Sequence, residues 1–231
     1  MRPRIVCHMA SSLDGRIIPS RWMPKGVHDH GIYEDLHERL GGGSWIVGRA
    51  TGQEFAKVDV YPDVTTTAFA REAWLPIRDA EAYAFVVDAG GKIAWGRAEI
   101  DGDPIVVLLT SEVSDAHLAG LRGDGVGYLF AGRNGLDLAG AMFLVRQKLG
   151  VEHLLLEGGG GLNGSFLRAG LVDEISLMLE PTIDGVRGAP STFDASDGGA
   201  LNHLPIASLT LKSHEVLDNG ILWLRYAVEA G

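Results

Sequence analysis

The sequence predicts an α/β protein with a mainly parallel central sheet, helices on both faces and a C-terminal antiparallel hairpin. Short apolar runs alternate along the chain with segments of helical spacing, a pattern typical of parallel strands covered by helices. Asn219 and Gly220 lie between two alternating segments near the C-terminal end, which is the strongest short-range hairpin signal. No linker, repeat or low-complexity stretch interrupts the 231 residues, so residues 1–231 are predicted to form a single domain.

Each expected strand is a short apolar run, and each expected helix has apolar spacing or a recognisable end. The expected strands are 4–10, 44–48, 82–88, 104–110, 126–132, 152–157 and 173–181, followed by the hairpin over 206–229. The expected helices are 33–40, one capped by Thr51, 114–122, 138–149 and 163–170. Asp137 is a good N-cap and Gly150 a good C-terminal stop for the helix between them. Residues 57–80 lack a clear period and predict a loop with an irregular helix.

Composition limits the classes of partner. The net charge of −10 argues against nucleic acid and anionic membranes, which are bound by basic patches. Cys7 is the only cysteine, so an intramolecular disulfide or a cysteine-based zinc site is excluded and a reducing cytoplasm is expected. No signal peptide pattern is present, and no uncharged apolar run approaches the roughly 18 residues of a membrane helix.

A run of glycines from Gly158 to Gly161 follows the apolar stretch ending in Glu157 and precedes a helix-like segment. A helix start presents unpaired N–H groups, and glycines let a pyrophosphate approach the backbone closely. Gly159, Gly161 and Gly164 fit the G-x-G-x-x-G spacing, but no series of βαβ units follows, so the full dinucleotide-binding half-fold is not predicted. A turn without a ligand is the alternative.

A second junction has the same character. In "WIVGRATGQEF" a strand passes through Gly48 and Arg49 into a helix near Thr51. Gly48 permits close approach, Thr51 is expected to cap the helix, and Arg49 is suited to a phosphate. Ligands of open α/β sheets bind at the carboxyl ends of strands, so the two junctions together favour a nucleotide cofactor.

Three segments together resemble the reductase domain of riboflavin biosynthesis, the C-terminal domain family of the bifunctional deaminase-reductases, which has a dihydrofolate-reductase-like fold. They are "HMASSLDGRI", "IVGRAT" and "LLLEGGGGLNGSFLRAGLVDEISLMLEPTIDG". The resemblance implies an NADPH-dependent, homodimeric reductase. Its substrate in that pathway is a ribosylamino-pyrimidine phosphate such as 5-amino-6-(5-phosphoribosylamino)uracil, whose sugar is reduced to the ribityl form.

The resemblance also implies roles for particular residues. Asp14 and Glu157 match acidic residues expected at the catalytic site, and His8 and Ser12 match substrate-side positions. The positions expected near the cofactor are Gly48, Arg49, Thr51, Thr110, Gly158, Gly159, Gly160, Gly161 and Leu162. Proton transfer by either carboxylate requires a raised pKa, which burial provides. Asp14 also fits an Asx turn before Gly15, and Glu157 also fits pairing at a helix terminus.

One position departs from the family pattern. Riboflavin-pathway reductases commonly carry lysine six residues before the aspartate, where this chain has His8, a side chain that is largely neutral at pH 7. The substrate therefore stays open, with a dihydrofolate-type pteridine reductase or a non-catalytic NADPH-binding regulator as alternatives. The zinc deaminase motif of the bifunctional enzymes is absent.

Some other polar residues allow more than one role. His28, His30 and His37 match no standard zinc spacing, so no metal is expected, and they are predicted to be solvated loop residues or a rim around the substrate. Arg133, after a predicted strand, is equally suited to a cofactor 2′-phosphate and to an exposed loop.

Overall fold

The structure is a computed structural model and describes residues 1–194 and 204–231. The chain folds into two compact units. The first comprises Met1–Pro3 and Gly43–Leu154, and the second comprises Arg4–Gly42 and Leu155–Gly231. The prediction of a single reductase domain stays a prediction, and each unit is described separately below.

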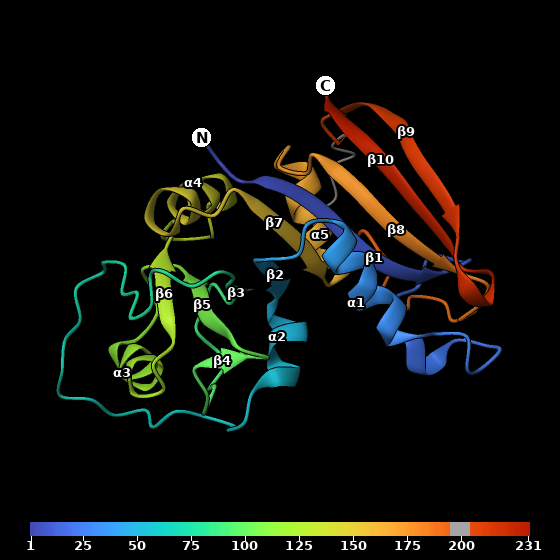
Figure 1. Ribbon diagram of the computed structural model, residues 1–231. Helices are drawn as coiled ribbons and strands as arrows, with labels where there is room; N and C mark the ends of the chain where they lie inside the picture. The colour runs from blue at the N-terminus through green and yellow to red at the C-terminus, as the bar shows by residue number, and fades with distance from the viewer. Residues whose placement is uncertain (195–203) are drawn as a thin grey trace. The chain divides into compact units, whose positions relative to one another are not determined.

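The first unit is built on parallel strands that lie in the order β5-β3-β2, with β6 also paired to β5 (Figure 1). Its strands are β2 (Trp45–Gly48), β3 (Ala84–Val87), β4 (Glu99–Ile100), β5 (Asp103–Leu109) and β6 (Gly127–Phe130). Its helices are α2 (Arg49–Phe55), α3 (Asp115–Gly123) and α4 (Leu138–Leu149). The pairs β2–β3, β3–β5 and β5–β6 are parallel, and only the short β4 runs antiparallel to β5. Their apolar side chains form a buried core that includes Trp95 and Tyr128.

The helix ends of this unit follow the sequence signals at most positions. Asp137 caps α4 by accepting a hydrogen bond from the Gly140 N–H, and Gly150 ends the helix in the left-handed conformation with φ of 71°. The predicted Thr51 cap is wrong, because α2 begins at Arg49 with Gly48 in the extended N-cap position and Thr51 in the first turn. The irregular helix expected within 57–80 is also absent from this described segment, where only Trp74 forms a β-bridge, to Tyr128.

The second unit contains the strands in the order β7-β1-β8-β10-β9. They are β1 (Arg4–Ser12), β7 (His153–Gly158), β8 (Glu174–Glu180), β9 (Ile206–Val216) and β10 (Leu222–Ala230). Strand β1 is parallel to β8, whereas β10 is antiparallel to both β8 and β9. The unit also holds α1 (His30–Arg39), α5 (Gly160–Arg168) and the 3-10 turns η1 (Pro19–Arg21) and η2 (Asp218–Gly220).

The predicted C-terminal hairpin is confirmed. Strands β9 and β10 run side by side, red in Figure 1, and the turn between them places Asn219 at φ 58° and Gly220 at φ 73°. Both values lie in the left-handed region that Asn-Gly pairs accommodate. Among the described helices none combines the length and apolar character needed to cross a membrane.

Candidate active site

The glycine run forms the junction between β7 and α5. Strand β7 ends at Gly158, Gly159 turns the chain with φ of 79°, and α5 starts at Gly160. The helix therefore begins earlier than the predicted residue 163, inside the glycine run itself. As at any helix start, the first amides have no acceptor within the helix and carry a partial positive charge. This arrangement suits the phosphate of a dinucleotide.

Gly160 and Gly161 in this junction differ in how tightly the surrounding residues pack against them. A Cβ on Gly160 would lie 2.0 Å from the Ser191 carbonyl oxygen, and the Asp194 N–H donates to the Gly160 carbonyl at 2.9 Å. Gly160 is thus required by packing against the chain's own residues 191–194. Gly161 is exposed, and among residues 1–194 and 204–231 its Cβ would meet only the Asp194 carbonyl oxygen, at 3.7 Å. The Leu162 N–H donates to the Gly159 carbonyl oxygen at 3.0 Å, so the first turn fits an anionic group best at Gly161. The predicted cofactor contact at Leu162 stays a prediction.

Glu157 lies immediately before this junction and is paired with a histidine. Its Oε1 is 2.8 Å from Nδ1 of His37 on α1, and each side chain is only 12% exposed. Burial raises the pKa of Glu157, while the hydrogen bond from His37 opposes that rise. The hydrogen bond to Glu157 in turn raises the pKa of His37. The pair consequently retains a proton at a higher pH than the isolated groups would.

His8 lies in β1 and is completely buried. Its Nδ1 is 3.1 Å from Ser176 Oγ, which accepts a hydrogen bond from Trp223 Nε1 at 2.8 Å. The Ser176 hydroxyl hydrogen is then free to point to His8 Nδ1, which leaves the proton of the neutral ring on Nε2, 3.4 Å from the Tyr33 carbonyl oxygen. Burial lowers the pKa of His8 to about 4, so the ring is neutral at pH 7.

Tyr33 covers the His8 ring. The two rings stack with centroids 4.2 Å apart, and the Tyr33 hydroxyl donates to the His8 carbonyl oxygen at 3.0 Å. Direct contact between His8 and a substrate would require this stacking to open. The predicted substrate-binding role of His8 stays a prediction, and within the second unit its observed contacts fix Tyr33 and α1.

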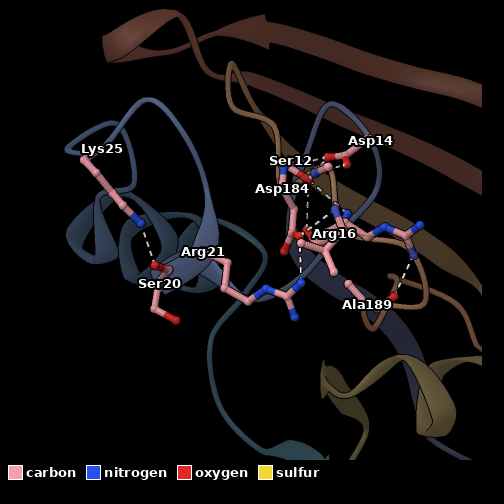
Figure 2. A network of polar contacts seen from close by, with 10 residues as sticks. Ser12, Asp14, Arg16, Ser20, Arg21, Lys25, Asp184 and Ala189 are labelled. Atoms are coloured by element: carbon pink, nitrogen blue, oxygen red, sulfur yellow. Dashed lines mark hydrogen bonds and ion pairs between the residues drawn. The ribbon is translucent and has the colours of Figure 1, made fainter.

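Asp14 holds a loop (Figure 2). Its Oδ1 accepts from the Ser12 hydroxyl at 2.6 Å and from the Asp184 N–H at 3.1 Å, and its Oδ2 accepts from the Gly185 N–H at 2.8 Å. These hydrogen bonds, led by that from Ser12, lower the pKa of the exposed Asp14 carboxylate to about 2. Asp14 is therefore an anion at neutral pH and an acceptor of hydrogen bonds. Of the two predicted catalytic carboxylates, only Glu157 has the raised pKa that proton transfer requires.

The three histidines singled out in the sequence contact three different carboxylates. His28 Nδ1 lies 2.5 Å from Oε1 of the buried Glu180, and His30 lies 3.4 Å from Glu34 on the surface of α1. Only His37 approaches a predicted site residue. Its partner is 120 positions away in the sequence, so no local spacing could have identified the pair.

The other predicted cofactor residues lie in the first unit. Gly48 and Arg49 stand where β2 passes into α2, with Arg49 exposed and Thr51 half-buried in the first turn. Thr110 directly follows β5, and its hydroxyl donates to the Ala89 carbonyl oxygen at 2.8 Å. The paired register of β2, β3 and β5 puts Gly48 and Thr110 at the carboxyl ends of parallel strands.

Two further polar residues follow strand ends of the first unit. Asp88, after β3, is buried and its Oδ2 accepts from the Lys92 and Ile93 N–H groups, which shapes the loop between them. Arg133, after β6, donates from Nε to Glu112 at 2.8 Å, and both side chains are exposed. The 2′-phosphate role of Arg133 stays a prediction.

Comparison with known proteins identifies the family. Residues 3–223 match the family model of the RibD C-terminal domain. A 2,5-diamino-6-ribosylamino-4(3H)-pyrimidinone 5′-phosphate reductase of Methanothermobacter thermautotrophicus is 36% identical over 202 residues, which cover 84% of this chain and 85% of that protein.

Solved structures share the fold. A pyrimidine reductase-like protein of Corynebacterium diphtheriae superposes with a TM-score of 0.69 at 18% identity, over 99% of this chain and 93% of that one. The RibD protein of Acinetobacter baumannii gives a TM-score of 0.67 at 20% identity, and this chain, 99% covered, spans only 58% of that longer protein. The riboflavin biosynthesis reductase of Saccharomyces cerevisiae gives 0.59 at 15% identity over 99% and 90% of the two chains. By its sequence match and its fold, the chain belongs to the RibD C-terminal domain family.

Proposed function

We propose that this protein is an NADPH-dependent reductase that converts a ribosylamino-pyrimidine phosphate into its ribitylamino product. The family match and the 36% identical pyrimidinone phosphate reductase support this class of reaction. The observation that carries the proposal is the junction of β7 and α5, where a buried carboxylate with a raised pKa directly precedes a helix start suited to a phosphate.

The family implies a nicotinamide dinucleotide, and this chain has residues that fit its phosphates. In the second unit the proposed phosphate contact is the Gly161 amide. In the first unit the proposed cofactor-binding residues are Gly48, Arg49, Thr51 and Thr110. The bound nicotinamide would supply the hydride. The protein's own contribution is to orient the substrate, to exclude water and to hold a proton.

The two predicted carboxylates have different proposed roles. Glu157, largely buried and hydrogen-bonded to His37, forms with it the pair that holds a proton at the site. Asp14 is proposed to act as an anion that keeps Asp184 and Gly185 in place beside Ser12, and to orient a polar group of the substrate. This division follows from the opposite directions of their pKa shifts.

Turnover and binding assays test the proposal. Purified protein is titrated with NADPH and with NADH, and then supplied with the diaminopyrimidinone phosphate, the aminouracil phosphate or dihydrofolate. We expect tight NADPH binding and oxidation that depends on one of the two ribosylamino-pyrimidines. Failure to bind either dinucleotide would contradict the proposal, turnover of dihydrofolate alone would indicate a pteridine reductase, and binding without turnover would indicate a regulator.

We also infer a cytoplasmic homodimer. Cys7 is a buried free thiol, as expected in a reducing compartment. Strand β9 stands at the end of the strand order of its unit and exposes the apolar side chains of Leu209, Leu211 and Val216. An exposed apolar edge of this kind favours pairing with a second copy. Size-exclusion chromatography with light scattering tests the oligomeric state, and a monomer at micromolar concentration would contradict the homodimer.

A further inference from the structure

His37 has one nitrogen engaged and one available. Nδ1 is hydrogen-bonded to Glu157 Oε1 at 2.8 Å. Nε2 makes no hydrogen bond within the described residues and is not among their fully buried, unpartnered polar atoms. The side chain keeps 12% of its surface exposed. A protonated imidazole held in this way is oriented through Nδ1–H and carries its second N–H on Nε2, on the side of the ring away from Glu157.

His8 supplies no positive charge at neutral pH, because it is fully buried, stacked under Tyr33 and has a pKa lowered to about 4. Protonating His8 is further opposed by the charge of His37, which acts on it directly. His37 is thus the imidazole that is hydrogen-bonded to the predicted catalytic carboxylate, and its pKa is raised.

We propose that His37 is the proton donor of the reaction, acting from Nε2, and that Glu157 is the positioning residue that holds its Nδ1–H. This inference rests on the proposed reductase function. The bound dinucleotide would supply the hydride that C1′ of the ribosyl group accepts as the bond from C1′ to the ring oxygen breaks. The ring oxygen takes the proton from His37 Nε2, giving the ribityl hydroxyl, the oxidised nicotinamide and a neutral His37 that regains a proton from water.

The charged surroundings favour a protonated His37. Glu157 faces it from β7, and Glu34 and Glu38 act on it from its own helix. Each of these carboxylates raises the pKa of His37, whereas its partial burial opposes protonation. The other imidazoles near the pair are those of His8 on β1, which is neutral at pH 7, and His30, which lies 3.4 Å from Glu34.

The kinetic test compares the wild type with His37→Gln, using the pyrimidine phosphate that the wild type reduces. General acid catalysis contributes typically 10²–10⁴-fold, so we expect kcat to fall by about 100-fold or more, with NADPH affinity unchanged. The wild-type kcat should decline as pH rises through the pKa of His37, and the variant should lose this dependence. His214→Gln, on the exposed part of β9, is the control and should behave as the wild type.

A kcat within twofold of the wild type, or an unchanged pH profile, would overturn the proposal. A second measurement does not need turnover. The imidazole of His37 is titrated by NMR in the free protein, and in the Glu157→Gln variant. We expect a pKa above 6.5 in the wild type that drops in the variant. A wild-type value at or below 6.5 would overturn the inference, whereas a wild type without any turnover would contradict the proposed function instead.

Discussion

The glycine junction offers a matched pair of substitutions, Gly160→Ala and Gly161→Ala. The two residues are neighbours at the start of α5, but their surroundings differ. At Gly160 the new methyl group would lie 2.0 Å from the Ser191 carbonyl oxygen, 1.0 Å inside the 3.0 Å below which Cβ atoms essentially never approach another heavy atom. At Gly161 the nearest atom of the described part of the chain, the Asp194 carbonyl oxygen, is 3.7 Å away, an ordinary contact.

The expected magnitudes follow from these distances. Alanine ordinarily stabilises a helix by about 0.5–1 kcal/mol relative to glycine, and less at its first turn. Gly161→Ala should therefore leave the free energy of unfolding unchanged or slightly higher. Overpacking costs typically 1–3 kcal/mol, and displacing residues 191–194 also weakens the hydrogen bond from the Asp194 N–H to Gly160, worth about 1 kcal/mol. Gly160→Ala should be destabilised by about 2–4 kcal/mol.

Urea unfolding followed by circular dichroism measures both variants, and the midpoints give the comparison. NADPH titration of the folded Gly161→Ala protein gives a second readout, since the methyl group is expected to crowd the proposed phosphate contact and weaken binding. Equal midpoints for the two variants would refute the packing argument. Undiminished NADPH binding by Gly161→Ala would refute the placement of the phosphate at this turn.

Three further predictions concern buried or bonded charges. Because the pKa of His8 is lowered in the folded protein, stability should fall as pH drops from about 6.5 to about 4, by up to about 3 kcal/mol, and acid unfolding of His8→Gln should lack this contribution. Glu174→Gln should lose about 1.5–3 kcal/mol in thermal or urea unfolding, because this buried carboxylate is bonded to Arg225 and two other partly exposed cations; a loss below 1 kcal/mol would disprove it. The pKa of Asp14 of about 2 means that Asp14→Asn should leave the kcat–pH profile unchanged between pH 5 and 8, as steady-state kinetics can verify.

The elements with local signals were predictable. Helix α4 has a cap residue at Asp137, a helical apolar spacing and a terminating glycine, all within the same short stretch. The Asn-Gly turn likewise specifies its hairpin from two residues. Local propensity and observed structure agree at these positions because tertiary contacts do not compete with them.

The start of α5 shows where local propensity fails. Glycines disfavour helix, so the sequence predicts a start near residue 163, yet the helix begins at Gly160. Packing against Ser191 and Asp194 requires a residue without a side chain there, and this tertiary demand overrides propensity. Thr51 shows the same limit of prediction from local sequence. Threonine is a good N-cap residue, but Gly48 takes the extended N-cap position and Thr51 lies in the first turn.

The candidate site was only partly predictable for a related reason. Glu157 and the glycine run are adjacent in sequence, so the sequence alone predicts that they lie close together. His37 and Tyr33 reach the site through α1, more than a hundred residues earlier, and only the folded second unit brings them to Glu157 and His8. The burial that raises the pKa of Glu157 also depends on long-range contacts, as do the hydrogen bonds from the Asp184 and Gly185 N–H groups to Asp14. The leading hydrogen bond to Asp14, from Ser12, is local.

Isotope transfer from the cofactor tests the proposed reaction most directly. The protein is incubated with the ribosylamino-pyrimidine phosphate and NADPH carrying deuterium at the transferable position, and the product is examined by mass spectrometry and NMR. The proposal predicts one deuterium in the product, on C1′ of the ribityl chain. Product without deuterium, deuterium at another carbon, or no reduced product from either pyrimidine phosphate would contradict it.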